Sequence, residues 1–193
     1  MNRRLAILLV SGAVLLILAA IFFLSRSGGG GGAGESVLDA PVEASGEEPK
    51  RVATTLYFPG GGRALFAESR DLLEGSREQR ARGILEALLA GPETKGLWRP
   101  LPESVSVGGI YFGDGGILFV DLLAKDQPAP PAQGSNQELL AVYSLVNSLA
   151  LNLDECRGVA ILWNGVQRPS FAGHVDTGRP LAANPRLVAS KAS

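Results

Sequence analysis

The strongest constraint on this chain is a run without charge from Leu5 to Leu24, LAILLVSGAVLLILAAIFFL. A helix of that length rises about 30 Å, which matches the hydrocarbon core of a bilayer. Arg3 and Arg4 precede the run. The positive-inside rule therefore predicts a cytoplasmic tail over residues 1–4, a transmembrane signal anchor over 5–24, and one pass through the cytoplasmic (inner) membrane. The rest of the chain is then extracytoplasmic, or periplasmic.

A cleaved signal peptide is the alternative interpretation of this run. The apolar region of a signal peptide has about 7–15 residues, which favours the anchor. Ser25-Arg26-Ser27 has the small-x-small pattern of a cleavage site, so cleavage stays open. No cysteine directly follows the run, as a lipoprotein signal would require. Both interpretations place the folded part outside the cytoplasm.

A flexible linker is expected over residues 25–51, which are rich in Gly, Pro and Glu and have few large apolar side chains. The folded domain is expected over 52–183, followed by a C-terminal tail over 184–193. Without Arg3, Arg4 and Arg26, the remaining chain has 18 − 3 = 15 basic and 19 acidic residues, a net charge of −4. This charge argues against nucleic acid and anionic lipid as ligands.

The expected domain begins with a strand and a helix. The segment VATTLYFP starts at Val52 and is rich in β-branched and aromatic residues, and a short return strand is expected around residues 64–68. Ser76 and Gln79 form the pattern of a capping box, which marks the start of a helix. The pair Gly91-Pro92 marks its end.

The order helix then hairpin occurs twice in the remaining sequence. The first hairpin turns at Asp114-Gly115, and Gly108-Gly109 in its first arm predict a bulge. A second helix is expected to begin with a capping box of Ser135 and Glu138, and a second hairpin to turn at Asn164-Gly165. The fold class is therefore α+β, in the order β-(αββ)-(αββ). Its two helices are expected on one face of a mixed or antiparallel sheet of about five strands.

The residues available for catalysis are few. Cys156 is the sole cysteine, and the neighbouring acids Asp154 and Glu155 would raise its thiol pKa rather than activate it. FPGGGR lacks the lysine and Ser/Thr of a phosphate-binding loop. These patterns predict no catalytic residue, no cofactor and no metal site.

The sole histidine, His174, stands near Asp176 and Arg179, and these three are the weak functional candidates. In a strand, residues i and i+2 share a face, so a contact between His174 and Asp176 needs no catalytic purpose. No nucleophile or second base accompanies them, which favours a structural role. This stretch is interpreted as a final strand, a turn at Thr177-Gly178 and a tail fixed by Pro180.

Several segments in order resemble the GerMN domain, which is named from spore germination and sporulation proteins. They are TLYFP, LLAGP, LPESVSV, GGILFVDL, LLAVYSLVNSLA, GVAILWNG and AGHVDTGRPL, and they cover residues 54–181. The resemblance implies a compact, extracytoplasmic α+β domain without established catalytic residues. The positions that match its motifs are expected to specify the fold: Gly91, Pro92, Asp121, Asn147, Gly165, Gly173 and Pro180.

Two functions follow as hypotheses. The first is a non-enzymatic, membrane-tethered binding or assembly module of the cell envelope, linked to sporulation or germination, with an envelope protein as partner. Its candidate surfaces are an exposed sheet edge, which can accept a strand, and the proline-rich loop DQPAPPAQG. The alternative is an envelope enzyme or ligand-binding domain that acts on peptidoglycan or its fragments through His174, Asp176 and Asp121.

Overall fold

The computed structural model describes residues 49–190. The expected cytoplasmic tail, the membrane anchor and all but the end of the linker lie outside these residues. Between residues 49 and 190, no helix is long and apolar enough to span a bilayer. The described residues form an α+β domain in which two α-helices accompany a two-stranded hairpin and a four-stranded sheet.

The domain begins with an antiparallel hairpin of β1 (Arg51–Pro59) and β2 (Leu65–Leu73). Their register runs from Arg51 opposite Leu73 to Pro59 opposite Leu65. The return strand is therefore longer than the short one expected around residues 64–68. Leu56 and Phe58 of β1 are fully buried, so this strand contributes one face to the core.

Helix α2 (Arg77–Ala90) has the predicted capping box. The Ser76 hydroxyl accepts from the Gln79 backbone N–H at 3.2 Å, and the Gln79 side chain accepts from the Ser76 N–H at 2.8 Å. The helix ends at Gly91, whose N–H donates to the Leu88 carbonyl at 3.1 Å. Both predicted ends of this helix are confirmed, and its buried face is formed by Ala81, Ile84, Leu85 and Leu88.

The four-stranded sheet has the order β3-β4-β5-β6. Its strands are β3 (Val105–Phe112), β4 (Ile117–Ala124), β5 (Gly158–Trp163) and β6 (Val166–Gln167). Helix α3 (Ser135–Ala150) crosses between β4 and β5, which are parallel because such a crossover returns the chain in the same direction. The other two pairs are antiparallel, so the predicted mixed sheet is confirmed.

The predicted turns and bulge are also confirmed. The register of β3 against β4 shifts between Val107 and Ile110, at the Gly-Gly pair. The short 3-10 segment η1 (Asp114–Gly116) joins β3 to β4. Asn164 and Gly165 both have positive φ, 51° and 79°, as a two-residue hairpin turn requires.

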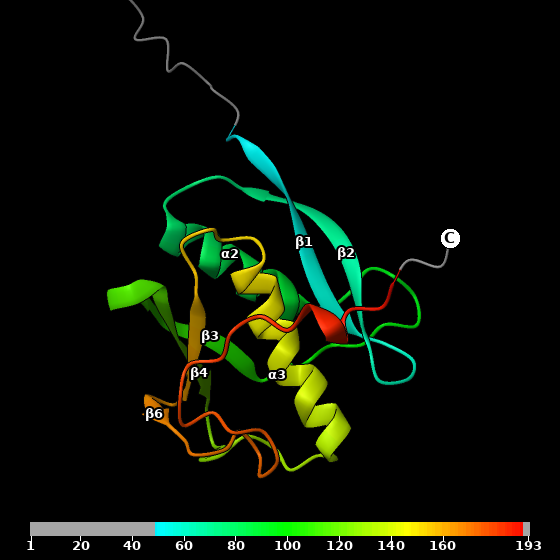
Figure 1. The fold of residues 1–193 in the computed structure, drawn as a ribbon, viewed down its shortest axis with the longest axis vertical. Helices are drawn as coiled ribbons and strands as arrows, with labels where there is room; N and C mark the ends of the chain where they lie inside the picture. The colour runs from blue at the N-terminus through cyan, green and yellow to red at the C-terminus, as the bar shows by residue number, and fades with distance from the viewer. Residues whose placement is uncertain (1–48, 191–193) are drawn as a thin grey trace, which may run out of the picture. The chain divides into compact units, whose positions relative to one another are not determined.

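The helices lie between the two sets of strands (Figure 1). Figure 1 shows α2 and α3 with the β1–β2 hairpin on one side and strands β3 and β4 on the other. One continuous core joins all these elements, and its largest fully buried side chains include Trp163, Phe58, Leu85, Leu122 and Leu145.

The expected single sheet of about five strands is wrong, because β1 does not join the larger sheet. Polar side chains of α3 occupy the free edge of β1 instead. The Ser148 hydroxyl accepts from the Tyr57 N–H at 2.9 Å, and the Ser144 hydroxyl donates to the Tyr57 carbonyl at 2.5 Å. One turn later, the Asn152 amide accepts from the Thr55 N–H and donates to the Thr55 carbonyl. These bonds satisfy the backbone groups that a further strand would pair with.

Two local predictions fail near the C-terminal half of the domain. Helix α3 starts after Gly134, without a side-chain cap, so Ser135 and Glu138 form no capping box. Residues 170–176 form a loop closed by a bridge between Ser170 and Asp176, not a final strand. The Glu138 side chain turns to this loop and binds its backbone instead.

Candidate binding site

The candidate site is built around the buried carboxylate of Glu138, in the first turn of α3. One oxygen, Oε1, accepts from the backbone N–H groups of Ala172, His174 and Val175 at 2.8, 3.0 and 2.8 Å. The other, Oε2, lies 2.7 Å from Nδ1 of the His174 ring. The loop over residues 171–175 therefore folds around a single buried acid.

Two opposing effects set the pKa of Glu138. Burial by itself raises the pKa, because it penalises the charged form. The N–H donors of Ala172 and Val175, together with His174, outweigh burial and lower the pKa below its ordinary value. Glu138 is therefore a carboxylate, and Nδ1 of His174 is the donor in their contact. The nitrogen left for other partners is Nε2.

The three weak candidates line one hollow, but their side chains do not bond as one group. His174 pairs with Glu138, not with Asp176 as its spacing predicted. Asp176 instead bonds Arg179, with 3.2 Å between Oδ2 and Nε, and accepts from the Gly178 N–H at 3.0 Å. The side chains of Asp176 and Arg179 are both mainly exposed. The structure thus separates an anchored histidine from a surface ion pair.

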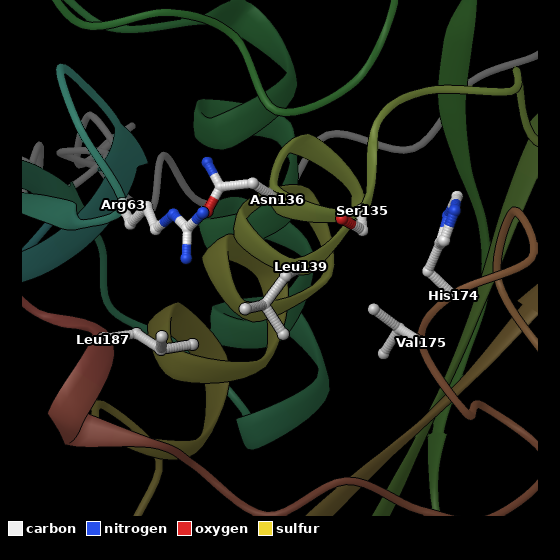
Figure 2. Close-up of a pocket in the computed structure, with 7 residues that line it drawn as sticks. All are labelled: Arg63, Ser135, Asn136, Leu139, His174, Val175 and Leu187. Carbon is white, nitrogen blue, oxygen red and sulfur yellow. The ribbon is translucent and has the colours of Figure 1, made fainter.

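His174 borders a hollow of about 380 Å³ on the surface of the domain. Figure 2 shows Arg63 and His174 on opposite sides of this hollow, with Leu139 between them, Leu187 beside Arg63 and Val175 beside His174. The first turn of α3 completes its wall through Ser135 and Asn136.

A second hollow, of about 310 Å³, shares Leu139, His174 and Val175 with the first. It continues past Tyr143 to Arg179. Because they share three lining residues, the two hollows adjoin, and together they are called the α3 groove below.

The glycine-rich loop between β1 and β2 places Arg63 at one end of the α3 groove. The Asn136 amide donates to the Gly62 carbonyl at 3.5 Å, which links this loop to α3. The Arg63 side chain is exposed, and it makes no ion pair with any residue between 49 and 190. The segment FPGGGR is thus a hairpin loop that presents a guanidinium.

The chain shares its sequence pattern with a known protein family. The family model described as "Germane: Sporulation and spore germination" matches residues 55–168, more than half of the chain. The chain belongs to this family. The resemblance to the GerMN domain is therefore confirmed. No curated protein matches the chain.

Solved structures share this GerMN fold at low sequence identity. The first GerMN domain of the sporulation protein GerM from Bacillus subtilis is 19% identical, with a TM-score of 0.52, over 68% of this chain and 97% of that one. The tandem GerMN domains of the same protein are 18% identical, with a TM-score of 0.52, over 69% of this chain and 46% of that one. A candidate lipoprotein from Clostridium perfringens is 18% identical, with a TM-score of 0.50, over 72% of this chain and 94% of that one.

Two of the GerMN motif positions, Asp121 and Gly165, contact each other. The Asp121 carboxylate accepts from the Gly165 N–H at 2.8 Å, which ties strand β4 to the second hairpin turn. Asn147, buried in α3, exchanges two hydrogen bonds with the backbone of Asn184, at 2.8 and 3.0 Å. These contacts hold a turn and the C-terminal segment, and neither lies in the α3 groove.

The other motif positions lie at the ends of elements. Gly91 and Pro92 follow α2, and the Gly91 carbonyl accepts from Arg70 at 3.0 Å. Gly173 lies in the loop around Glu138 and has a φ of 117°. Pro180 is exposed and lies beside Gly158 at the start of β5.

The remaining reactive group, Cys156, is buried. Burial raises the pKa of its thiol, and the nearby charge of Glu155 raises it further. Between residues 49 and 190, no three acidic, His or Cys side chains gather as a metal site would need. The α3 groove combines charge, apolar surface and space, and it adjoins the loop that Glu138 holds. A larger hollow of about 570 Å³, lined by Arg51, Leu72 and Arg82 among others, lies between β2 and α2.

Arg63 and Glu138 were not identified as site residues from the sequence. Arg63 belongs to a loop whose glycines suggested only flexibility. Glu138 fitted a capping box, and nothing in its local sequence indicates a loop that lies 34 residues or more away. Their roles depend on tertiary contacts that a local pattern does not contain.

Proposed function

We propose that the chain is a non-enzymatic binding or assembly module of the cell envelope, linked to sporulation or germination. Membership of a sporulation and germination family supports the link to these processes. The observation that carries the proposal is the hydrogen bonding of His174. His174 uses Nδ1 to bind Glu138, and Glu138 is fully occupied by the loop, so the pair holds a binding groove in shape.

A catalytic role for the same pair needs a reacting partner bonded to it, and among residues 49–190 no hydrogen bond joins His174 to the hydroxyls of Ser135 or Tyr143, which line the groove. General acid–base catalysis requires a second group, such as a nucleophile or an activated water site, within hydrogen-bond reach. Ser135 lines the same hollow as His174, together with the apolar side chains of Leu139 and Val175. This arrangement favours recognition of a ligand over its conversion.

Tethering to the membrane is the second part of the proposal. Its support is the uncharged run from Leu5 to Leu24, preceded by two arginines, which fits a single-pass anchor with the domain on the extracytoplasmic side. The segment between the anchor and β1 would then serve as the linker of this tether. Protease accessibility in spheroplasts tests the orientation, since an extracytoplasmic domain is degraded without lysis.

A protein partner is the preferred ligand, and crosslinking in intact cells tests it. A photoreactive amino acid at Lys125 places the probe on an exposed position beside the proline-rich loop. We expect a crosslinked envelope protein during growth or sporulation. The edge of β1 is a poor strand acceptor, because α3 covers it. Probes at Lys125 and on the α3 groove that capture no protein under any growth condition would refute the proposal.

Peptidoglycan fragments are the second candidate ligand. The free guanidinium of Arg63 favours a carboxylate, and the stem peptides of peptidoglycan carry carboxylates. Sedimentation of the chain with purified cell-wall sacculi tests this candidate. Retention that depends on Arg63 would support it, and no retention would remove it.

A further inference from the structure

We infer that residues 37–43, which precede the domain, add to the free edge of β2 as a parallel strand. The inference goes beyond the proposed function, because it concerns how the chain covers an edge of its own sheet. Three observations carry it: a row of unpaired backbone groups on β2, a hollow beside that row, and a matching pattern in residues 37–43.

The outer edge of β2 has backbone groups without partners. Side chains of α3 and of the turn after it bind both backbone groups of Thr55 and of Tyr57, so these groups point away from β2. Ser69 and Ala67 lie directly opposite Thr55 and Tyr57. Such a pair exchanges no hydrogen bonds, so the N–H and C=O groups of Ser69 and Ala67 point away from β1. Residues 49–190 offer these groups no partner.

The start of this edge already pairs with an extended segment. The Leu65 carbonyl accepts from the Ala189 N–H at 2.8 Å, and Val188 lies parallel to Leu65. Further along, the Asp71 carbonyl accepts from the exposed Arg51 side chain, which a strand can replace. The edge therefore accepts backbone partners that run parallel to β2.

The hollow of about 570 Å³ between β2 and α2 lies on the inner side of this edge. Leu72 of β2 and Gly83 and Ala87 of α2 are in its lining. A Cβ added at Gly83 would meet nothing within 4 Å, so space is left beside α2. Apolar side chains of an added strand fit here, and their burial is favourable.

Residues 37–43, VLDAPVE, have the pattern of such a strand. They contain the only large apolar side chains between residues 25 and 50. Alternate residues of a strand lie on opposite faces, so one face of this segment is apolar and the other is mainly acidic or proline. The apolar face consists of Leu38, Ala40 and Val42, and the other of Val37, Asp39, Pro41 and Glu43.

Pro41 determines which residues face β2. It has no N–H, so in an edge strand its backbone faces solvent. The backbone groups of the apolar residues, which alternate with Pro41, then face β2. These groups supply the donors and acceptors that Ser69 and Ala67 lack.

The orientation of the strand follows from the hairpin itself. β1 is antiparallel to β2, and its residues that face β2, Leu56 and Phe58, have buried side chains. On the opposite edge of β2 this relation is reversed, so a strand whose inward residues face β2 has to be parallel. A parallel strand therefore directs the apolar face of residues 37–43 into the hollow and leaves Pro41 at the solvent edge. Val188 has the same orientation.

Residues 44–50 are long enough to connect this strand to β1. The Lys50 carbonyl accepts from the Glu74 N–H at 2.8 Å, at the end of the hairpin where a parallel strand would also end. The connection crosses two strand spacings, about 10 Å, and seven residues span up to about 23–25 Å. The added strand closes an edge at which other chains could pair. On the tether proposed above, it leaves residues 25–36 as the spacer.

Hydrogen exchange of the full-length chain in mild detergent, measured by NMR, tests the inference. Ala40→Pro removes an N–H that faces β2, so it should release the segment. The amides of Ala67 and Ser69 should then exchange at least about tenfold faster than in the unmodified chain. Asp39→Pro is the matched control, because the N–H of Asp39 faces solvent, and it should keep the slow exchange.

The Tyr57 amide reports whether the hairpin is intact. Ser148 binds this amide on the other edge of the hairpin, so it should exchange equally in all three chains.

Fast exchange at Ala67 and Ser69 in the unmodified chain overturns the inference, and so does slow exchange that persists in Ala40→Pro. Persistent slow exchange that increases with protein concentration assigns the edge to a second copy of the chain. Equal acceleration by both proline variants overturns the parallel orientation. Acceleration by Ala40→Pro alone supports the inference. None of these results depends on crosslinking at the α3 groove, so failure here leaves the proposed function intact.

Discussion

The side-chain amide of Asn152 pairs with both backbone groups of Thr55. Its oxygen accepts from the Thr55 N–H at 3.1 Å, and its nitrogen donates to the Thr55 carbonyl at 2.7 Å. A neighbouring strand would offer the same donor and acceptor. Asn152, Ser148 and Ser144 stand four residues apart, so one face of α3 and the turn after it replaces a strand along the edge of β1.

Replacement of Asn152 by alanine is expected to destabilise the domain by about 2–4 kcal/mol, since it leaves two backbone groups of Thr55 without partners. Urea unfolding followed by circular dichroism measures this loss. Asn136→Ala is the control, because its single side-chain bond, to Gly62, is long and exposed. A loss no larger than that of the control would contradict the role given to Asn152.

The two helix starts should respond differently to the loss of a serine. Ser76→Ala removes the hydroxyl that accepts from the Gln79 N–H and should cost about 1 kcal/mol. Ser135→Ala should change the free energy of unfolding by less than about 0.5 kcal/mol, because Ser135 caps nothing. Equal costs for the two substitutions would show that α3 is capped after all.

Stability should fall at acid pH through Glu68, a buried residue of β2. Its carboxylate accepts from the backbone N–H of Thr94 at 2.8 Å and from Arg70 Nε at 2.8 Å. Burial raises its pKa, but the bonds from Thr94, Glu93 and Arg70 outweigh burial and lower the pKa from 4.5 to about 2.

The folded state therefore favours the charged form of Glu68. Its contribution is present above the ordinary pKa of 4.5 and is lost as the pH falls toward about 2. That contribution is on the order of 3 kcal/mol. Unfolding free energies measured across this range should show a smaller decline in Glu68→Gln, which should be less stable than the unmodified chain at neutral pH. If the free energy of unfolding falls as steeply with falling pH in Glu68→Gln as in the unmodified chain, the acid sensitivity comes from other groups.

Gly115 and Gly116, in the turn between β3 and β4, give a matched pair. Both have positive φ, 68° and 77°, so alanine costs about 1–2 kcal/mol at either position. At Gly116 an added Cβ would also lie 2.4 Å from the Glu155 carbonyl oxygen, whereas nothing lies within 4 Å at Gly115. Thermal unfolding should therefore show a larger loss for Gly116→Ala. Equal losses would contradict the close approach of these two loops.

The sequence predicted well those elements that local chemistry determines. The Ser76–Gln79 box, the Gly91-Pro92 stop and the turn at Asn164-Gly165 each depend on neighbouring residues, and each formed as predicted. The bulge at Gly108-Gly109 belongs to the same class. Local backbone preference and short-range hydrogen bonds are sufficient at these positions.

The failures concern polar side chains whose partners are distant in the chain. Glu138 has the spacing of a cap, yet its partners are the N–H groups of residues 172–175. Ser144 and Asn152 stand in an apolar helix and the turn after it, where helical periodicity identifies a buried face but not which strand it meets. The available signal was the spacing of Ser144, Ser148 and Asn152, which are polar and four residues apart. Such a row indicates that the helix hydrogen-bonds the backbone of a neighbouring strand.

The central claim is that the α3 groove, held in shape by Glu138 and His174, is where a partner binds. Crosslinking in intact cells from Ser135, an exposed residue that lines the groove, tests it most directly. Mass spectrometry of the product should identify a single envelope protein. A partner captured from Lys125 but never from Ser135 would contradict the claim.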